Sequence, residues 1–213
     1  MPFLKVQRMS FAALGLLFIP ALHAQSDYHR FTFSAGGGFT TQTGRIANDL
    51  DNGGNLQLSG GINAGILSLN GTFMFNGMGL TRSSLQEVNV PDGYAHVYTF
   101  TIDPKLRVPL GRVNLYAVGG GGWMRRTVTF TKPVLAETIV FNPWWGYYGP
   151  ALVPASQSLG SVSENAGVWD VGGGFDFPLP RTGWKLFVEA RYFDGMTSQT
   201  RTTIVPITVG LRW

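Results

Sequence analysis

Residues 167–179, GVWDVGGGFDFPL, contain the pattern that decides the fold. The aromatic residues Trp169 and Phe175 occupy odd positions, whereas Asp170 and Asp176 occupy even positions. Residues two apart share one face of a β-strand, so this segment has an apolar face and a polar face. The stretch therefore predicts a strand that separates two different environments.

Seven further segments repeat this alternation. They lie at about 31–39, 56–64, 67–75, 98–108, 113–129, 184–192 and 205–213. Short connections are expected after the second, fourth and sixth strands, and long ones after the first, third and fifth, at 42–54, 77–95 and 130–164. An even strand number, with short periplasmic turns and long extracellular loops, is typical of bacterial outer-membrane barrels.

The composition indicates which face meets lipid. Charged residues make up only 13% of the 213 residues, compared with about 25% in ordinary soluble domains. The polar face holds mainly Ser, Thr, Asn, Gly and charged residues, which are too small and too polar for a hydrophobic core. We therefore predict an all-β, transmembrane, antiparallel up-and-down barrel of eight strands, apolar outside and polar inside. An added hairpin within 130–164 would raise the count to ten.

The N-terminal segment predicts export. Lys5 and Arg8 precede an apolar run at 10–22, and the pattern favours a signal peptide (residues 1–24) cleaved after Ala24. The run is shorter than the roughly 18–20 residues of a membrane-spanning helix. The remainder, 25–213, is expected to be one barrel domain in the outer membrane. The absence of cysteine excludes disulfides, thiolate metal sites and a lipid anchor.

Charged residues on the predicted inward face would form a network in the lumen. They are Asp103, Lys105, Arg107, Asp170, Asp176, Glu189, Arg191 and Arg212. Acids and bases are balanced, and side chains can fill the interior of an eight-stranded barrel. Two interpretations stay open, a salt-bridged plug and an ion path or gate, and the plug is favoured.

Three stretches carry a resemblance to a known family: residues 167–179, WKLFVEARY at 184–192 and ITVGLRW at 207–213. On these residues the chain resembles the eight-stranded outer-membrane β-barrel family, the OmpA/OmpX-like group. The resemblance implies this fold and an outer-membrane location in a diderm bacterium. It also implies that the C-terminal Trp213 is part of the signal read by the barrel-assembly machinery. We expect outer-membrane lipid around a monomer.

Catalytic and cofactor patterns are weak. His96 follows Asp92 closely enough for an acid–base pair to be conceivable, but the His-x-Ser arrangement expected by analogy with lipid A deacylases is missing. His29 is expected at the periplasmic rim, too far away in sequence for a metal site. No basic run interleaved with aromatic residues suggests nucleic acid binding. We expect no enzyme, no cofactor and no metal.

The predicted loop at 130–164 is the candidate functional segment. It contains Trp144, Trp145, Tyr147 and Tyr148, and exposed aromatic side chains on loops are frequent binding anchors. A lid over the barrel mouth, or a cluster lying on the outer leaflet, would also explain them. The favoured function is a structural or surface-interaction role. The alternatives are a narrow channel for small or apolar solutes, a lipid-modifying outer-membrane enzyme and a soluble periplasmic barrel.

Overall fold

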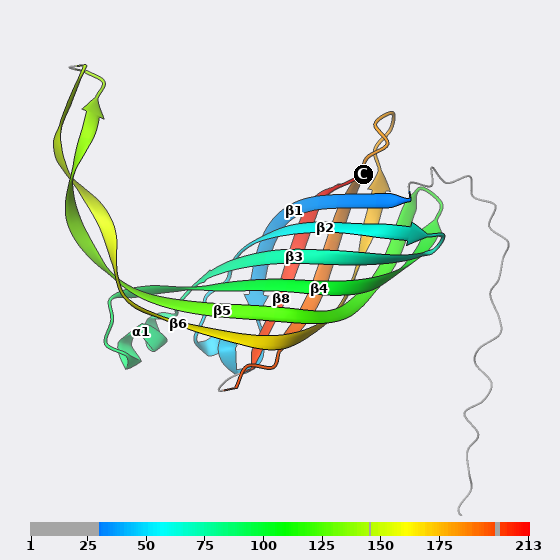
Figure 1. Cartoon of the computed structure of the whole chain (residues 1–213), viewed down its shortest axis with the longest axis horizontal. Coiled ribbons are helices and arrows are strands. Elements are labelled where there is room, and N and C mark those ends of the chain that lie inside the picture. Colours follow the sequence, from blue (N-terminus) through cyan, green and yellow to red (C-terminus); the bar gives the residue numbers. More distant parts are fainter. Residues whose placement is uncertain (1–29, 145, 199–200) are drawn as a thin grey trace, which may run out of the picture.

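The computed structural model shows one antiparallel sheet closed into a barrel (Figure 1). It describes residues 30–144, 146–198 and 201–213, so the predicted signal peptide and its cleavage after Ala24 lie outside the described residues. The strands are β1 Phe31–Gln42, β2 Gly53–Ala64, β3 Leu67–Gly79, β4 Asp92–Leu110, β5 Val113–Asn142, β6 Tyr147–Pro178, β7 Lys185–Gly195 and β8 Thr202–Arg212. Each pairs with its neighbour in sequence, and β1 pairs with β8. The predicted eight-stranded barrel is confirmed, and the alternative of ten strands is wrong.

Side chains alternate between the outer surface and the lumen. On β4, Phe100 and Ile102 expose 49% and 55% of their surface, whereas Thr101 and Asp103 expose none. A soluble barrel encloses its apolar residues and exposes its polar ones. The reverse arrangement is that of a barrel whose exterior faces lipid.

Aromatic side chains mark the two boundaries of the lipid-facing surface. At one end Trp184 stacks on Trp213, with ring centroids 5.4 Å apart, and near the other end Trp169 packs 5.6 Å from Tyr192. Aromatic rings of this kind favour the interface between membrane and water. Beyond Trp169 the outward residue Asn165 is polar and exposed, so the strands leave the membrane there.

The two ends of the barrel carry different connections. At one end, two-residue turns join β2 to β3 and β4 to β5, and Gly65 (φ +68°) and Gly111 (φ +66°) supply the left-handed backbone that such tight turns need. At the other end lie the 3-10 helix η1 (Gly44–Asn48) and the helix α1 (Arg82–Glu87). No helix among the described residues is both long and apolar enough to cross a membrane. The predicted segregation of short turns and long connections is confirmed.

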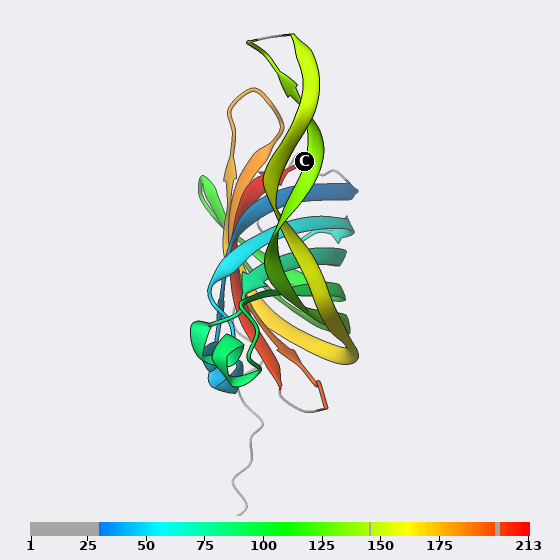
Figure 2. The same cartoon turned by 90° about the vertical axis from the view of Figure 1, so that its left-hand side faces the viewer.

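The prediction of a loop at 130–164 is wrong, because these residues continue two strands. β5 and β6 stay paired beyond the barrel as far as Asn142 and Tyr147. We name this two-stranded hairpin, residues 131–158, the arm. Figures 1 and 2 show the arm projecting past the barrel mouth and then turning across the long direction of the barrel. The extra hairpin therefore lengthens two barrel strands and adds none.

A matched pair of arginine substitutions tests the lipid-facing assignment. Ile102, 55% exposed on β4, faces lipid, whereas Ile139, 71% exposed, lies on the arm outside the membrane. We expect Ile102→Arg to lower the free energy of unfolding by about 2–4 kcal/mol, because the charge enters hydrocarbon. Ile139→Arg changes it by roughly 0.5 kcal/mol at most. Urea titrations in lipid vesicles measure both, and equal effects would contradict the assignment.

Candidate functional site

The middle of the lumen is organised around Arg191 on β7. Its Nη1 donates to Asp103 Oδ2 on β4 (2.7 Å) and to Asp170 Oδ2 on β6 (3.0 Å), and its Nε donates to Glu189 Oε1 (2.8 Å). β4 and β7 are not neighbours in the sheet, so the bond between Arg191 and Asp103 crosses the interior. One guanidinium therefore ties three strands together through the lumen.

A second group of charges lies toward the short-turn end. Arg212 on β8 forms an ion pair with Asp176 on β6, and Arg107 Nε lies 3.8 Å from the same carboxylate. Lys105 Nζ lies 3.6 Å from Glu189 Oε2, which is also 3.8 Å from Arg212 Nη2. Through Glu189 this group joins the bonds around Arg191. The structure thus brings all eight charged residues named from the sequence into one network.

Polar and aromatic side chains extend the network, and sequence reasoning did not identify them as its members. Gln57 on β2 donates to Glu189 (2.8 Å), and Thr72 on β3 donates to Asp103 (2.6 Å). The ring of Tyr116 on β5 lies 4.4 Å from Lys105 Nζ, within the range of a cation–π contact. Gln57 was visible as a member of the polar face of its strand. Tyr116 was not, because the glycines that follow it interrupt the alternation.

The extracellular half of the lumen contains an apolar layer, beside buried polar side chains such as Thr40 and Asn76. Ile46 and Leu50, from the connection between β1 and β2, pack with inward side chains of the strands. These side chains are Met74, Met78, Ala95, Val97, Met124, Val168, Phe193 and Ile204. The expectation that the inward face is too polar for a hydrophobic core is therefore wrong in this half. Nothing in the strand pattern indicated that a loop would supply two core residues.

The two layers close the interior. Asp103, Asp170, Glu189 and Arg191 expose between 0% and 3% of their surface, which leaves almost no area for water around the central charges. The apolar layer separates them from the extracellular mouth. The packing therefore favours the plug interpretation over an ion path.

Glu164 holds a loop to the base of the arm, outside the membrane. Its Oε1 accepts from the Oγ (2.7 Å) and the backbone N–H (2.5 Å) of Ser198, in the connection between β7 and β8. Its Oε2 accepts from Arg126 Nη2 (3.1 Å). The Ser198 hydroxyl and amide, followed by Arg126, stabilise the carboxylate and lower the pKa of Glu164 from its ordinary value.

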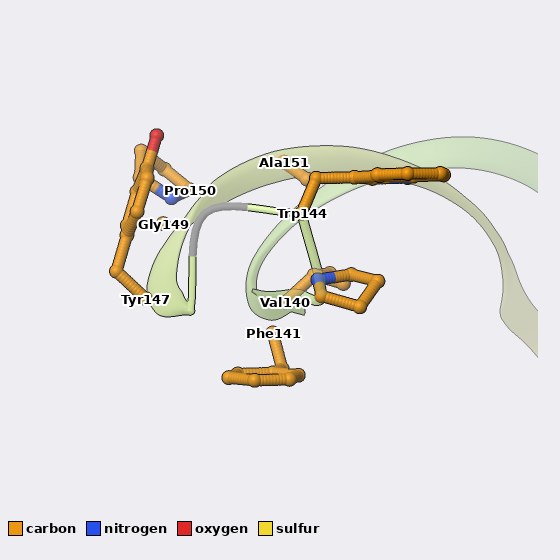
Figure 3. Close-up of a pocket in the computed structure, with 8 residues that line it drawn as sticks. Val140, Phe141, Trp144, Tyr147, Gly149, Pro150 and Ala151 are labelled. Atoms are coloured by element: carbon orange, nitrogen blue, oxygen red, sulfur yellow. The ribbon is translucent and has the colours of Figure 1, made fainter.

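The tip of the arm carries the predicted aromatic residues. Trp144, Tyr147 and Tyr148 expose 91%, 57% and 72% of their surface, and Trp145 lies outside the described residues. Phe141, which the sequence reasoning did not select, packs 5.2 Å from Tyr148. The tip borders an open hollow of about 300 Å³, and Figure 3 shows Trp144, Phe141 and Tyr147 on three sides of it. None of the described residues that line it is charged.

The conceivable pairing of His96 with Asp92 does not occur. His96 lies on the outer surface of β4, packed 4.8 Å from Tyr94 and 5.1 Å from Phe75, while Asp92 accepts the N–H of Gly93. His29 lies outside the described residues. Across the part of the chain that the structure describes, no three His, Cys, Asp or Glu side chains are grouped to hold a metal ion.

Comparisons with known proteins agree with this architecture. The model of a family described as outer membrane protein beta-barrel domain matches residues 9–212. The chain is similar to Neisserial surface protein A (NspA), with 11% identity, a TM-score of 0.58 and coverage of 86% of this chain and 96% of that one. It is also similar to a major outer membrane protein from Thermus thermophilus, with 13% identity, a TM-score of 0.54 and coverage of 86% and 97%. No curated protein matches the sequence. At these identities the solved structures support the fold alone.

Removing the central guanidinium is expected to destabilise the barrel. Arg191→Leu leaves Asp103, Asp170 and Glu189 buried without their shared cation, so we expect a loss of about 3–5 kcal/mol in the free energy of unfolding. Arg201→Leu is the matched control, because Arg201 is 71% exposed in its pair with Asp194 and such pairs contribute roughly 1 kcal/mol or less. Urea titration in vesicles measures both. A small effect at Arg191 would show that the network does not stabilise the barrel.

Acid is expected to release the loop at Ser198. Because the pKa of Glu164 is lowered in the folded protein, its stabilising contribution is present above the ordinary glutamate pKa of about 4.3 and is lost as the pH falls through the lower, folded value. The protection factor of the Ser198 amide in hydrogen exchange should decrease in that range. Glu164→Ala should remove the protection at neutral pH, and unchanged protection in this variant would refute the assigned contact.

Proposed function

Because the chain belongs to the family of outer membrane protein β-barrel domains and lies in the outer membrane, we propose that it presents the arm as an interaction surface outside the cell. The barrel is then a rigid, non-enzymatic support. In this family of structures, short turns face the periplasm and long connections face outward. The arm is the longest of the outward connections, so it reaches farthest from the membrane.

The observation that carries the proposal is the exposed apolar surface of the arm. Leu135, Ile139 and Leu152 expose 68%, 71% and 66% of their surface. The arm has only two charged residues, Lys132 and Glu137. Soluble surfaces rarely keep contiguous apolar patches unless these make contacts. The exposed rings at the tip add the residue types that most often anchor an interface.

The other end of the barrel supports a role for Trp213 in assembly. Trp213 exchanges backbone hydrogen bonds with Phe33 on β1 and stacks on Trp184. The last residue thus contributes to the closure of the ring and lies at the membrane boundary. A terminal aromatic residue in this place fits recognition by the barrel-assembly machinery.

The two alternative functions have less support. A conducting lumen requires water around the inward charges, and the packing around Arg191 leaves it little room. A lipid-modifying enzyme requires an activated group at the membrane surface. His96 lies there, but it packs against the aromatic rings of Phe75, Tyr94 and Tyr98, which supply no carboxylate to activate it.

Cell attachment tests the proposed function. The triple variant Phe141→Ser, Trp144→Ser, Tyr148→Ser removes the exposed rings, and anchors of this kind contribute roughly 2 kcal/mol or more each. We expect attachment of intact cells to polystyrene to fall to the level of cells lacking the protein. Val88→Ser, which changes a half-exposed apolar residue elsewhere on the extracellular side, is the control and should retain attachment.

Folding must be checked in the same cells. Each variant should show the mobility shift between unheated and boiled samples that marks a folded barrel in the outer-membrane fraction. Undiminished attachment of the triple variant, with folded protein at normal amounts, would overturn the proposal.

A further inference from the structure

The arm has two strand edges that no other strand covers. Pairing between β4 and β5 ends at Asp92 and Thr131, and pairing between β6 and β7 starts only at Val168 and Gly195. Along the arm, β5 and β6 therefore pair only with each other. A free edge presents a row of N–H and C=O groups, to which an extended strand can bind.

The hydrogen-bond pattern shows which residues face the free edge of β5. The C=O of Gly93 on β4 accepts the N–H of Leu80 on the β3 side of the strand. The backbone N–H and C=O of the next residue, Tyr94, therefore point toward β5. The backbone groups of its partner Thr129 consequently point back toward β4, as do those of every second residue along β5. The register shift between Phe130 and Thr131 places its extra residue, Leu159, on β6, so this alternation along β5 continues into the arm. Within the arm these residues are Thr131, Pro133, Leu135, Glu137, Ile139 and Phe141.

Prolines block the edge of β6. The residues of β5 whose backbone groups point to the free edge have partners on β6 whose backbone groups point to the opposite free edge. These partners include Pro154, opposite Leu135, and Pro150, opposite Ile139. A proline has no N–H, so this edge lacks alternate donors and accepts a further strand poorly. Their nitrogens face outward, so neither proline removes a bond within the arm.

The edge of β5 is open over one continuous run. Pro133 and Pro143 bracket residues 134–142, which contain no proline. Leu135 and Ile139, like the other odd-numbered residues of this run, direct both their N–H and their C=O to the free edge of β5. The arm therefore has one blocked edge and one open edge.

We propose that the open edge of β5 binds the same edge of a second copy of this chain, as an antiparallel pair. Such pairing uses both open edges and leaves the two proline-blocked edges of β6 outermost, so association stops at a dimer. A foreign strand would instead leave its own second edge open. The proposal rests on the proposed function for the exposure of the arm outside the cell, and it replaces the expected monomer.

The bracketing prolines define the register. The run 134–142 is symmetric about Thr138, so pairing centred there places Leu135 opposite Phe141 of the second copy and Glu137 opposite Ile139. The two Glu137 carboxylates do not meet, and the aliphatic–aromatic pair is a favourable cross-strand contact. Figures 1 and 2 show the outer part of the arm crossing the long direction of the barrel. Two arms can therefore run antiparallel while both barrels stand in the same membrane.

Disulfide cross-linking in native outer membranes tests the pairing. The chain has no cysteine, so Thr138→Cys introduces a single thiol. The backbone groups of Thr138 point away from the contact between the two copies, so the two Thr138 residues would form a non-hydrogen-bonded pair. The Cα atoms of such a pair are about 4.5 Å apart, within reach of a disulfide. Ala151, opposite Thr138 on β6, is the control position, because two such residues would be three strand spacings, about 14 Å, apart. We expect a dimer with Thr138→Cys and only monomer with Ala151→Cys.

Two proline substitutions separate edge pairing from chance collision. Glu137 and Leu152 occupy opposite positions on the two strands of the arm, and each directs its N–H to its own free edge. In the Thr138→Cys background, Glu137→Pro should abolish the cross-link, whereas Leu152→Pro should leave it unchanged. Glu137→Gln, which removes the charge alone, should also retain it. Equal cross-linking at positions 138 and 151, or a cross-link that survives Glu137→Pro, would overturn the dimer.

Labelling of intact cells distinguishes the two proposals. A membrane-impermeant maleimide should modify Thr138→Cys before oxidation if the arm lies outside the cell. Labelling without any cross-link would refute the dimer and leave the proposed function standing. A folded protein that is neither labelled nor cross-linked would refute the exposure of the arm, and with it both proposals.

Discussion

The need to satisfy every backbone hydrogen bond within lipid governs this structure. The hydrocarbon region offers no water to unpaired N–H and C=O groups, so a sheet can cross it only as a closed ring. The pairing of β1 with β8 provides that closure. Among the described residues, the long uncovered strand edges lie on the arm and on the part of β6 between the arm and Val168, beyond the membrane boundary. Within lipid every strand edge must therefore be paired, whereas in water an edge can stay unpaired. The change between these two conditions occurs partway along β5 and β6.

Closure also determines what the lumen must contain. An interior of eight strands is narrow, and charges placed there lose most of their hydration. Arg191 and Glu189 are acceptable because each has several partners of opposite charge. The apolar layer with Ile46 and Leu50 lies between these charges and the outer mouth. Together the layers make the barrel a solid support, which suits a protein whose exposed contacts lie elsewhere.

Sequence periodicity predicted the barrel because each spanning strand separates lipid from a polar interior. The same phase placed the eight lumen charges, since a charge such as Asp103 between Ile102 and Pro104 can face only inward. The apolar layer was missed for a physical reason: methionines such as Met74 occupy the polar phase, and Ile46 comes from a loop. The arm was missed because both of its faces meet water outside the membrane, so no alternation was required of it.

The prolines of the arm show how one residue type can support opposite inferences. Pro133, Pro150 and Pro154 lie in the segment predicted as a loop, and a proline removes a donor from a central strand. In the structure all three occupy positions whose nitrogen faces a free edge, where no bond within the arm is lost. Their shared phase follows from the ladder register and could not be read before the pairing was known. The positions of the prolines in this segment therefore indicate which strand edge is blocked to a further strand. The run without proline between Pro133 and Pro143 leaves the edge of β5 open, and this is the edge at which the arm can bind.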